Sequence, residues 1–185
     1  MERQNSRFQP LAATLTVLAA LLRLIPHPPN FAPVGSVALF GGARLRGWQA
    51  YLIPVLAMLV TDPILSYVAG ASAYSWMTPV IYGCFLVNVL LGRLLINAST
   101  DVRRIGGAAL LGSVQFYIIT NFFVWLHAAS LYPRTGAGLA TCYLAALPFF
   151  GRTVLGDLFY SALLFGAYAF LKNRKPHPAG YPAVG

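Results

Sequence analysis

The side chains best suited to chemistry lie between Tyr74 and Asn88, where an aromatic, uncharged stretch runs through Pro79 into an apolar segment. Proline is favoured at the first position of a helix, because its missing N–H would have no partner there. A helix that begins at Pro79 has Cys84 about one turn inside, with Asn88 four residues later on the same face. The spacing predicts that a soft sulfur, an amide and several aromatic rings meet at one depth.

The cysteines admit a second interpretation. A lone cysteine in an apolar helix is usually a small core residue, and this alternative stays open for Cys84. Cys142 lacks the aromatic setting and is assigned the structural role. Both lie in or beside apolar segments, so no disulfide framework is expected.

Charged residues inside apolar segments need partners, because burying a charge in a membrane is costly. The candidate partners of Asp62 are Arg23 and Arg152. Two alternatives to a functional role stay open: Asp62 belongs to a structural ion pair, or it caps a helix at the break expected at Pro63. Asp157 stands five residues after Arg152, which is poorly placed for direct contact on a helix. A structural role is therefore predicted for Asp157.

Sequence motifs exclude several classes of site. No HxxxH, CxxC, HExxH or paired-carboxylate spacing occurs, so a zinc or diiron site built from protein ligands alone is not expected. A Walker motif and a dinucleotide fingerprint are absent as well, so nucleotide hydrolysis is not expected. His27 is either a metal ligand or an exposed loop residue, and His127 is expected at a membrane interface.

Composition indicates an integral membrane protein. Of 185 residues, 58% are hydrophobic and 9% are charged, whereas soluble domains carry roughly 25% charged residues. The net charge of +9 comes from short clusters between apolar runs, which favours topology signals and lipid headgroups over nucleic acid. We expect one membrane domain over 1–185, with a bundle at about 10–171 and polar tails at 1–9 and 172–185.

Apolar runs predict an all-α bundle of six transmembrane helices. The piece at 35–43 is too short for an ordinary span of about 17–25 residues, unless 31–43 crosses as a partly irregular segment shielded by protein. Pro148 is expected to divide the last run into a loop-associated piece and a final span. The longer runs are 11–25, 48–68, 80–96, 105–126 and 139–171.

Six crossings place the basic clusters on one side, which the positive-inside rule makes cytoplasmic, together with both termini. The clusters are Arg3 with Arg7, Arg44 with Arg46, Arg103 with Arg104, and Lys172, Arg174 and Lys175. Three unusual loops, at 26–35, 69–77 and 127–138, then share the outer side, which suggests a ligand captured from outside. Ala12, Thr16 and Ala20 form a small-residue stripe, for packing within the bundle or for an external partner.

Three motifs carry a family resemblance: HPPNFAPVG at 27–35, LFGGA at 39–43 and MLVTDP at 58–63. They resemble the substrate-binding S components of energy-coupling-factor (ECF) transporters, and Cys84 makes the chain similar to the BtuM type, implicated in vitamin B12 uptake. The resemblance implies a multi-pass protein of the bacterial cytoplasmic (inner) membrane. It implies six helices, both termini cytoplasmic, and a vitamin bound under the three outer loops. It also implies that the stripe on the first helix meets a coupling subunit with its ATPases, although Thr16 stands where alanine is more usual.

The resemblance implies that the Cys84 sulfur binds the cobalt of cobalamin. A thiolate is a soft ligand for cobalt, so Cys84 is expected to be an axial ligand of cobalamin and to displace an upper ligand such as cyanide. Two alternatives stay open: a carrier of another vitamin or small metabolite, or a membrane enzyme that removes the upper axial ligand. The residues expected around the corrinoid are His27, Asn30, Phe31, Tyr74, Trp76, Tyr82, Phe85, Asn88 and Asn121.

Overall fold

The computed structural model describes residues 8–70, 72–127 and 131–174. Across these ranges the secondary structure is helical and contains no strand, which confirms the predicted all-α class. Arg3, Arg7 and Lys175, expected to be topology signals, lie outside the described residues. The elements are α2 (Gln9–Leu22), α3 (Val34–Arg44), α4 (Gln49–Ala69), α5 (Thr78–Leu91), the π-helical turn η1 (Gly92–Ile96), α6 (Val102–His127) and α7 (Gly136–Arg174).

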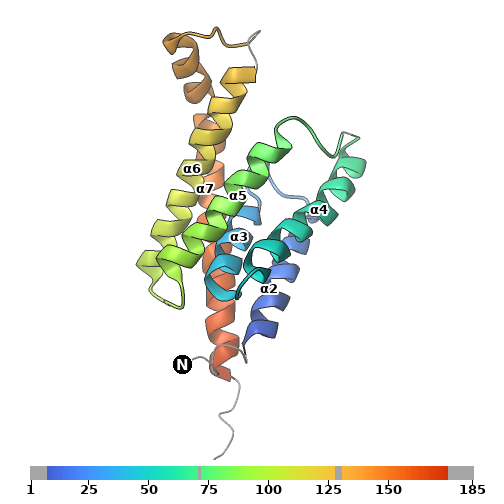
Figure 1. Ribbon diagram of the computed structural model, residues 1–185, viewed down its shortest axis with the longest axis vertical. Helices are drawn as coiled ribbons and strands as arrows, with labels where there is room; N and C mark the ends of the chain where they lie inside the picture. The colour runs from blue at the N-terminus through green and yellow to red at the C-terminus, as the bar shows by residue number, and fades with distance from the viewer. Residues whose placement is uncertain (1–7, 71, 128–130, 175–185) are drawn as a thin grey trace, which may run out of the picture.

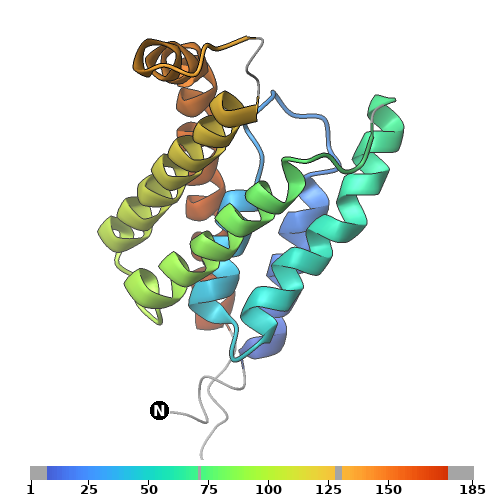
Figure 2. The same cartoon turned by 45° about the horizontal axis from the view of Figure 1, so that its top comes forward.

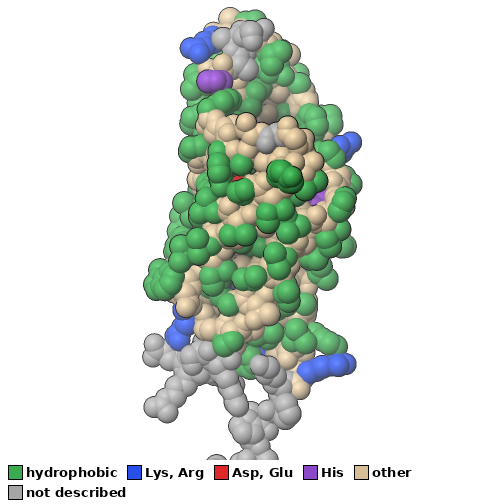
Figure 3. Space-filling view, turned by 90° about the vertical axis from the view of Figure 1, so that its right-hand side faces the viewer, with side chains coloured by type: hydrophobic (Ala, Val, Ile, Leu, Met, Phe, Trp, Pro, Cys, Tyr) green, Lys and Arg blue, Asp and Glu red, His purple; other side chains and the backbone are tan. Residues whose placement is uncertain are grey.

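Four helical segments are long and apolar enough to cross a bilayer: Gln49–Ala69, Thr78–Ile96, Val102–His127 and Gly136–Arg174. Hydrophobic side chains cover much of the surface drawn in Figure 3. At most a third of the most apolar window of any of these segments is buried inside the protein, so most of its side chains face outward. An apolar outer surface of this kind suits lipid and is compatible with a multi-pass membrane protein.

The six helices alternate in direction, so their connections collect at two ends (Figures 1 and 2). We call one the loop end; it holds the connections at 23–33, 72–77 and 131–135. We call the other the basic end; it holds the connections at 45–48 and 97–101, the start of α2 and the end of α7. The three unusual loops predicted to share a side do share one end of the bundle.

The short helix α3 lies at the centre of the bundle. Ten of its eleven residues are buried, and it packs against every other described helix and against η1. Glycine allows the closest approaches: a side chain at Gly42 would run into the backbone of Val89, and one at Gly92 would meet the carbonyl of Leu39. The segment at 31–43, predicted to be partly irregular and shielded by protein, is irregular at 31–33 and helical from Val34 onward, and the helical part is almost entirely buried.

The small-residue stripe on α2 is used inside the bundle. Ala12, Thr16 and Ala20 are all buried, and α2 packs against α3, α4 and α7. The stripe therefore packs within the bundle, which is one of the two alternatives predicted for it. The surface expected to meet a coupling subunit is covered by the protein itself.

Three prolines lie inside helices and do not end them. Pro54 and Pro63 stand within α4, so the alternative that Asp62 caps a helix break at Pro63 is wrong. Pro148 stands within α7, which runs unbroken from Gly136 to Arg174. The expected division of this segment takes the form of a bend, because the first part of α7 lies at an angle to the rest in Figure 2. A proline removes one helical hydrogen bond and crowds the preceding turn, which explains bending without termination.

Candidate ligand site at the loop end

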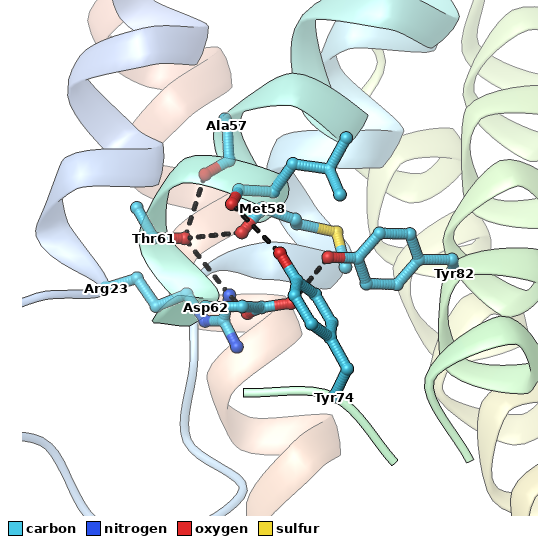
Figure 4. A network of polar contacts seen from close by, with 8 residues as sticks. Arg23, Ala57, Met58, Thr61, Asp62, Tyr74 and Tyr82 are labelled. Atoms are coloured by element: carbon cyan, nitrogen blue, oxygen red, sulfur yellow. Dashed lines mark hydrogen bonds and ion pairs between the residues drawn. The ribbon is translucent and has the colours of Figure 1, made fainter. Parts of the chain in front are cut away.

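An ion pair and its hydrogen bonds link the end of α2 to α4 and α5 at the loop end (Figure 4). Arg23, directly after α2, pairs with Asp62 of α4 and donates a hydrogen bond to Thr61 Oγ1 at 3.1 Å. The hydroxyl of Tyr82, on α5, donates to Asp62 Oδ2 at 2.6 Å. Of the two partners predicted for Asp62, Arg23 is the correct one, and Arg152 is exposed on α7. Tyr82, expected to cover a ligand, links α5 to α4 through this hydrogen bond.

Cys84 and Asn88 share a buried face of α5, as the four-residue spacing predicts. Their exposed fractions are 1% and 2%. Gln115 of α6 bridges them: its Nε2 donates to the Cys84 carbonyl at 3.0 Å and to Asn88 Oδ1 at 3.1 Å. The Oε1 of Gln115 is buried and has no partner among the described residues. In the sequence, Gln115 is a polar residue within an apolar run, but its contact with Cys84 could not be predicted.

Two aromatic stacks close the boundary between α5 and α6. Phe85 stacks on Phe116 with ring centroids 5.5 Å apart. Nearer the loops, Trp76 stacks on His127 with centroids 3.9 Å apart and an interplanar angle of 26°. We call these two stacks, together with the Gln115 bridge, the α5–α6 seam.

A cavity of about 270 Å³ lies beside this seam, between α6, α7 and the connection that precedes α3. Phe116 belongs to both the seam and the cavity wall. Of the three amides predicted to bind a ligand, Asn30 and Asn121 line the cavity, and Asn88 does not. The full lining is Asn30, Phe116, Tyr117, Thr120, Asn121, Ala146, Phe149, Phe150 and Thr153.

The remaining predicted residues do not line this cavity. Phe31 packs on α7, with its ring centroid 5.8 Å from Phe159 and 5.6 Å from Tyr160. Tyr74 is about half exposed, and its hydroxyl donates to the Leu59 carbonyl at 3.3 Å. His27 is partly exposed, with Nδ1 3.2 Å from the Pro28 carbonyl. The structure thus brings the predicted residues to one end, but it divides them among an ion-pair network, a buried face and a cavity wall.

The second charged residue in a span, Asp157, has a packing role. Ser113 Oγ donates to its Oδ2 at 2.6 Å, and Ser36 Oγ donates to its carbonyl at 2.8 Å. Gly35 leaves the room that this carboxylate occupies. The predicted structural role is supported, since Asp157 joins α3, α6 and α7 and makes no ion pair with Arg152.

The chemistry available at this end is that of thiols, amides and aromatic rings. Cys84 and Cys142 are both free, and within the described ranges no three His, Cys, Asp or Glu side chains gather where they could hold a metal ion. The cavity lies just below the size range of roughly 300–1,000 Å³ that is usual for pockets holding drug-sized ligands. Cys84 does not line this cavity and is 1% exposed, so a ligand can reach its sulfur only if the packing around α5 changes.

Comparison with known proteins places the chain in one family. Residues 3–179 match the model of a family of unknown function, DUF6580. Neither a curated protein nor a solved structure matches the chain.

Proposed function

The chain belongs to the DUF6580 family, for which no function is given, and we propose that it is a membrane protein that binds cobalamin at the loop end for uptake. The observation that carries the proposal is the position of Cys84. It is a free thiol held on the inner face of α5 by Gln115, and the residue after Gln115 is Phe116, a wall of the aromatic and amide-lined cavity.

The proposed topology has six crossings, with both termini on the cytoplasmic side. Alternation of helix directions in Figure 1 supports it, and α3 needs no lipid contact because the other helices enclose it. Basic residues are also concentrated at the basic end, as the positive-inside rule requires of a cytoplasmic face. In the described chain these are Arg44, Arg46, Arg93, Arg103, Arg104, Lys172 and Arg174. The membrane is proposed to be the bacterial cytoplasmic membrane.

The chemistry of the loop end suits a corrinoid. A corrin ring is broad, partly apolar and fringed with amides, so it pairs with aromatic rings and with amide side chains such as Asn30 and Asn121. In the proposal, opening of the α5–α6 seam enlarges the cavity and exposes the Cys84 thiol. The sequence features of the S components noted above support the same ligand class.

Ligation proceeds without a change in the oxidation state of cobalt(III). The Cys84 thiol loses its proton, and the thiolate electron pair forms the Co–S bond. Cyanide leaves the upper axial position with its own electron pair and takes up a proton as hydrogen cyanide. Asn88 and Gln115 are positioning residues in this step, because they hold the turn of α5 that carries the sulfur.

The test is the absorption spectrum of cyanocobalamin mixed with the purified protein. Formation of a Co–S bond changes the corrin absorption bands, and the Cys84→Ala variant is expected to leave them as in free cyanocobalamin. Cys142→Ala is the matched control, because Cys142 is also free and has an exposed fraction of 2%. An unchanged spectrum with the wild-type protein, or an equal change with Cys84→Ala, would contradict thiolate ligation.

The same experiment separates the alternatives. Release of more than one cyanide per protein molecule indicates an enzyme that removes the upper ligand. Tight binding of cobalamin that survives in Cys84→Ala indicates a carrier that does not use the sulfur, and no binding indicates a carrier of another metabolite. An ECF coupling subunit, with its ATPases, is proposed as a partner, but it would have to meet a face other than the buried stripe of Ala12, Thr16 and Ala20.

A further inference from the structure

A second cavity lies at the basic end, away from the loop-end site. Its volume is about 470 Å³. Its walls come from the start of α2, the connection after α3, the connection before α6 and the last turns of α7. The basic side chains in its wall are Arg44, Arg46, Arg93 and Lys172, and Asn97 and Tyr168 are among the other polar ones.

Arg44 is the unusual member of this set, because it is the last residue of α3 and only 8% of its surface is exposed. Its two terminal nitrogens donate to backbone carbonyls, one of Asn97 and one of Ser99, the second at 2.6 Å. The guanidinium also lies over Phe165 and Tyr168, 4.9 Å and 5.4 Å from the ring centroids. Its Nε is buried and has no hydrogen-bond partner among the described residues.

No carboxylate balances this buried charge within the described ranges. The ion pair found there joins Arg23 and Asp62 at the other end. Asp101 is the described acidic residue at the basic end, and its Oδ1 accepts the backbone N–H of Arg103 at 2.9 Å. A buried charge that meets only neutral groups is costly, so an anion in the cavity would supply the missing interaction.

The other cations are placed to reach such an anion. Arg93 and Lys172 are exposed and come from η1 and α7, on different walls of the cavity. Among the described residues, Arg93 donates a long hydrogen bond, 3.3 Å, to the Gly47 carbonyl and lies over the Tyr51 ring, 5.9 Å from its centroid. Lys172 lies 5.4 Å from the ring centroid of Phe8, so its ammonium group keeps its capacity to donate.

We propose that the basic-end cavity binds a phosphate group, carried by the headgroup of an anionic phospholipid or free in solution. Phosphate offers several acceptor oxygens and pairs strongly with guanidinium and ammonium donors. Basic pockets between membrane helices are typical sites for anionic lipid headgroups. The site would join α3, η1 and α7 through the anion, and it does not depend on the ligand of the loop end.

The test uses the full-length protein in detergent and compares two double variants of equal charge change. Arg93→Gln with Lys172→Gln removes two cavity cations and leaves Arg44 in place. Arg103→Gln with Arg104→Gln removes two exposed cations of α6, at the same end, that do not line the cavity. Native mass spectrometry measures the affinity for phosphatidylglycerol and for phosphatidylcholine, and thermal unfolding measures the effect of inorganic phosphate against chloride at equal ionic strength.

If the source is a lipid, the wild type prefers phosphatidylglycerol, and the cavity variant weakens that binding by about tenfold while the control variant keeps it. If the source is free phosphate, inorganic phosphate raises the unfolding temperature of the wild type and the control, but not of the cavity variant. Equal losses in both variants would mean general attraction of the charged surface and would overturn the proposal. So would a wild type that binds both lipids alike and responds to phosphate as it does to chloride.

Discussion

The two ends of the bundle handle polar groups in opposite ways. At the loop end, Arg23 meets a carboxylate and a tyrosine, Asp62 and Tyr82, and the cavity of about 270 Å³ has no charged side chain in its wall. At the basic end, Arg44 meets carbonyls and aromatic rings and no carboxylate within the described ranges, and several cations line a larger cavity. The loop end therefore pairs its charges internally and lines its cavity with uncharged side chains, whereas the basic end leaves a buried cation without a carboxylate among the described residues.

The largest effect is expected from Arg44→Ala at the basic end. The change removes the donor to the Asn97 and Ser99 carbonyls and the packing of a buried side chain over Phe165, so a loss of about 3 kcal/mol of unfolding free energy is expected. Thermal or denaturant unfolding in detergent measures it. Arg44→Lys keeps the charge but not the two-pronged donor, and it should recover only part of the loss. A neutral Arg44→Ala would show that Arg44 is not an anchor of this end.

At the loop end, Asp62→Ala is expected to cost about 2 kcal/mol, because it leaves Arg23 without its counter-ion. The cost is below that of a fully buried pair, since both side chains retain some exposure. The same unfolding measurement tests it, with Arg152→Ala as the control for loss of an exposed charge. If the two changes cost the same, the pair does not join α2 to α4 in the way described.

Two asparagines allow the backbones of the two ends to be compared. Among the described residues, Asn30 at the loop end and Asn97 at the basic end are the non-glycine residues with positive φ, 64° and 50°. The ψ of Asn97 is −128°, a combination that glycine adopts far more easily. Asn97→Gly should therefore stabilise the protein by about 1 kcal/mol, while Asn30→Gly should be nearly neutral because its left-handed conformation suits asparagine. Equal shifts in unfolding temperature would contradict this difference.

The smallest effect is expected from Trp76→Ala, which removes the stack on His127. Such a contact contributes about 1 kcal/mol, so the unfolding temperature should fall only slightly. If the α5–α6 seam opens to admit the ligand, the same change should speed cobalamin binding in stopped-flow absorption. Exposed Trp48, at the other end of the bundle, provides the control, and Trp48→Ala should leave the binding rate unchanged. Equal binding rates in the two variants would argue against opening at this seam.

Much of the loop end followed from local spacing. Four-residue spacing predicted that Cys84 and Asn88 share one face of a helix. The cost of a charge within a span predicted an ion-pair partner for Asp62, and this partner is Arg23. Pro63 and Pro148 predicted disturbed helices. Whether each helix breaks or continues through its proline depended on the packing of α4 and α7. Gln115 and the stack of Phe85 on Phe116 could not be predicted, because each joins two helices and no local pattern links their positions.

The sequence by itself determined that the chain is helical, apolar and basic at the helix ends, because these properties depend on composition and on the lengths of the apolar runs. Only the tertiary structure decided which face of each helix is inside. In a protein suited to lipid, outer and inner faces are equally hydrophobic, so the periodicity that separates them in soluble proteins is weak. Close approach at glycines such as Gly42 and Gly92 then made the short helix α3 the centre of the bundle. That arrangement buried Arg44 and Cys84 at opposite ends, where the phosphate site and the cobalamin site are proposed.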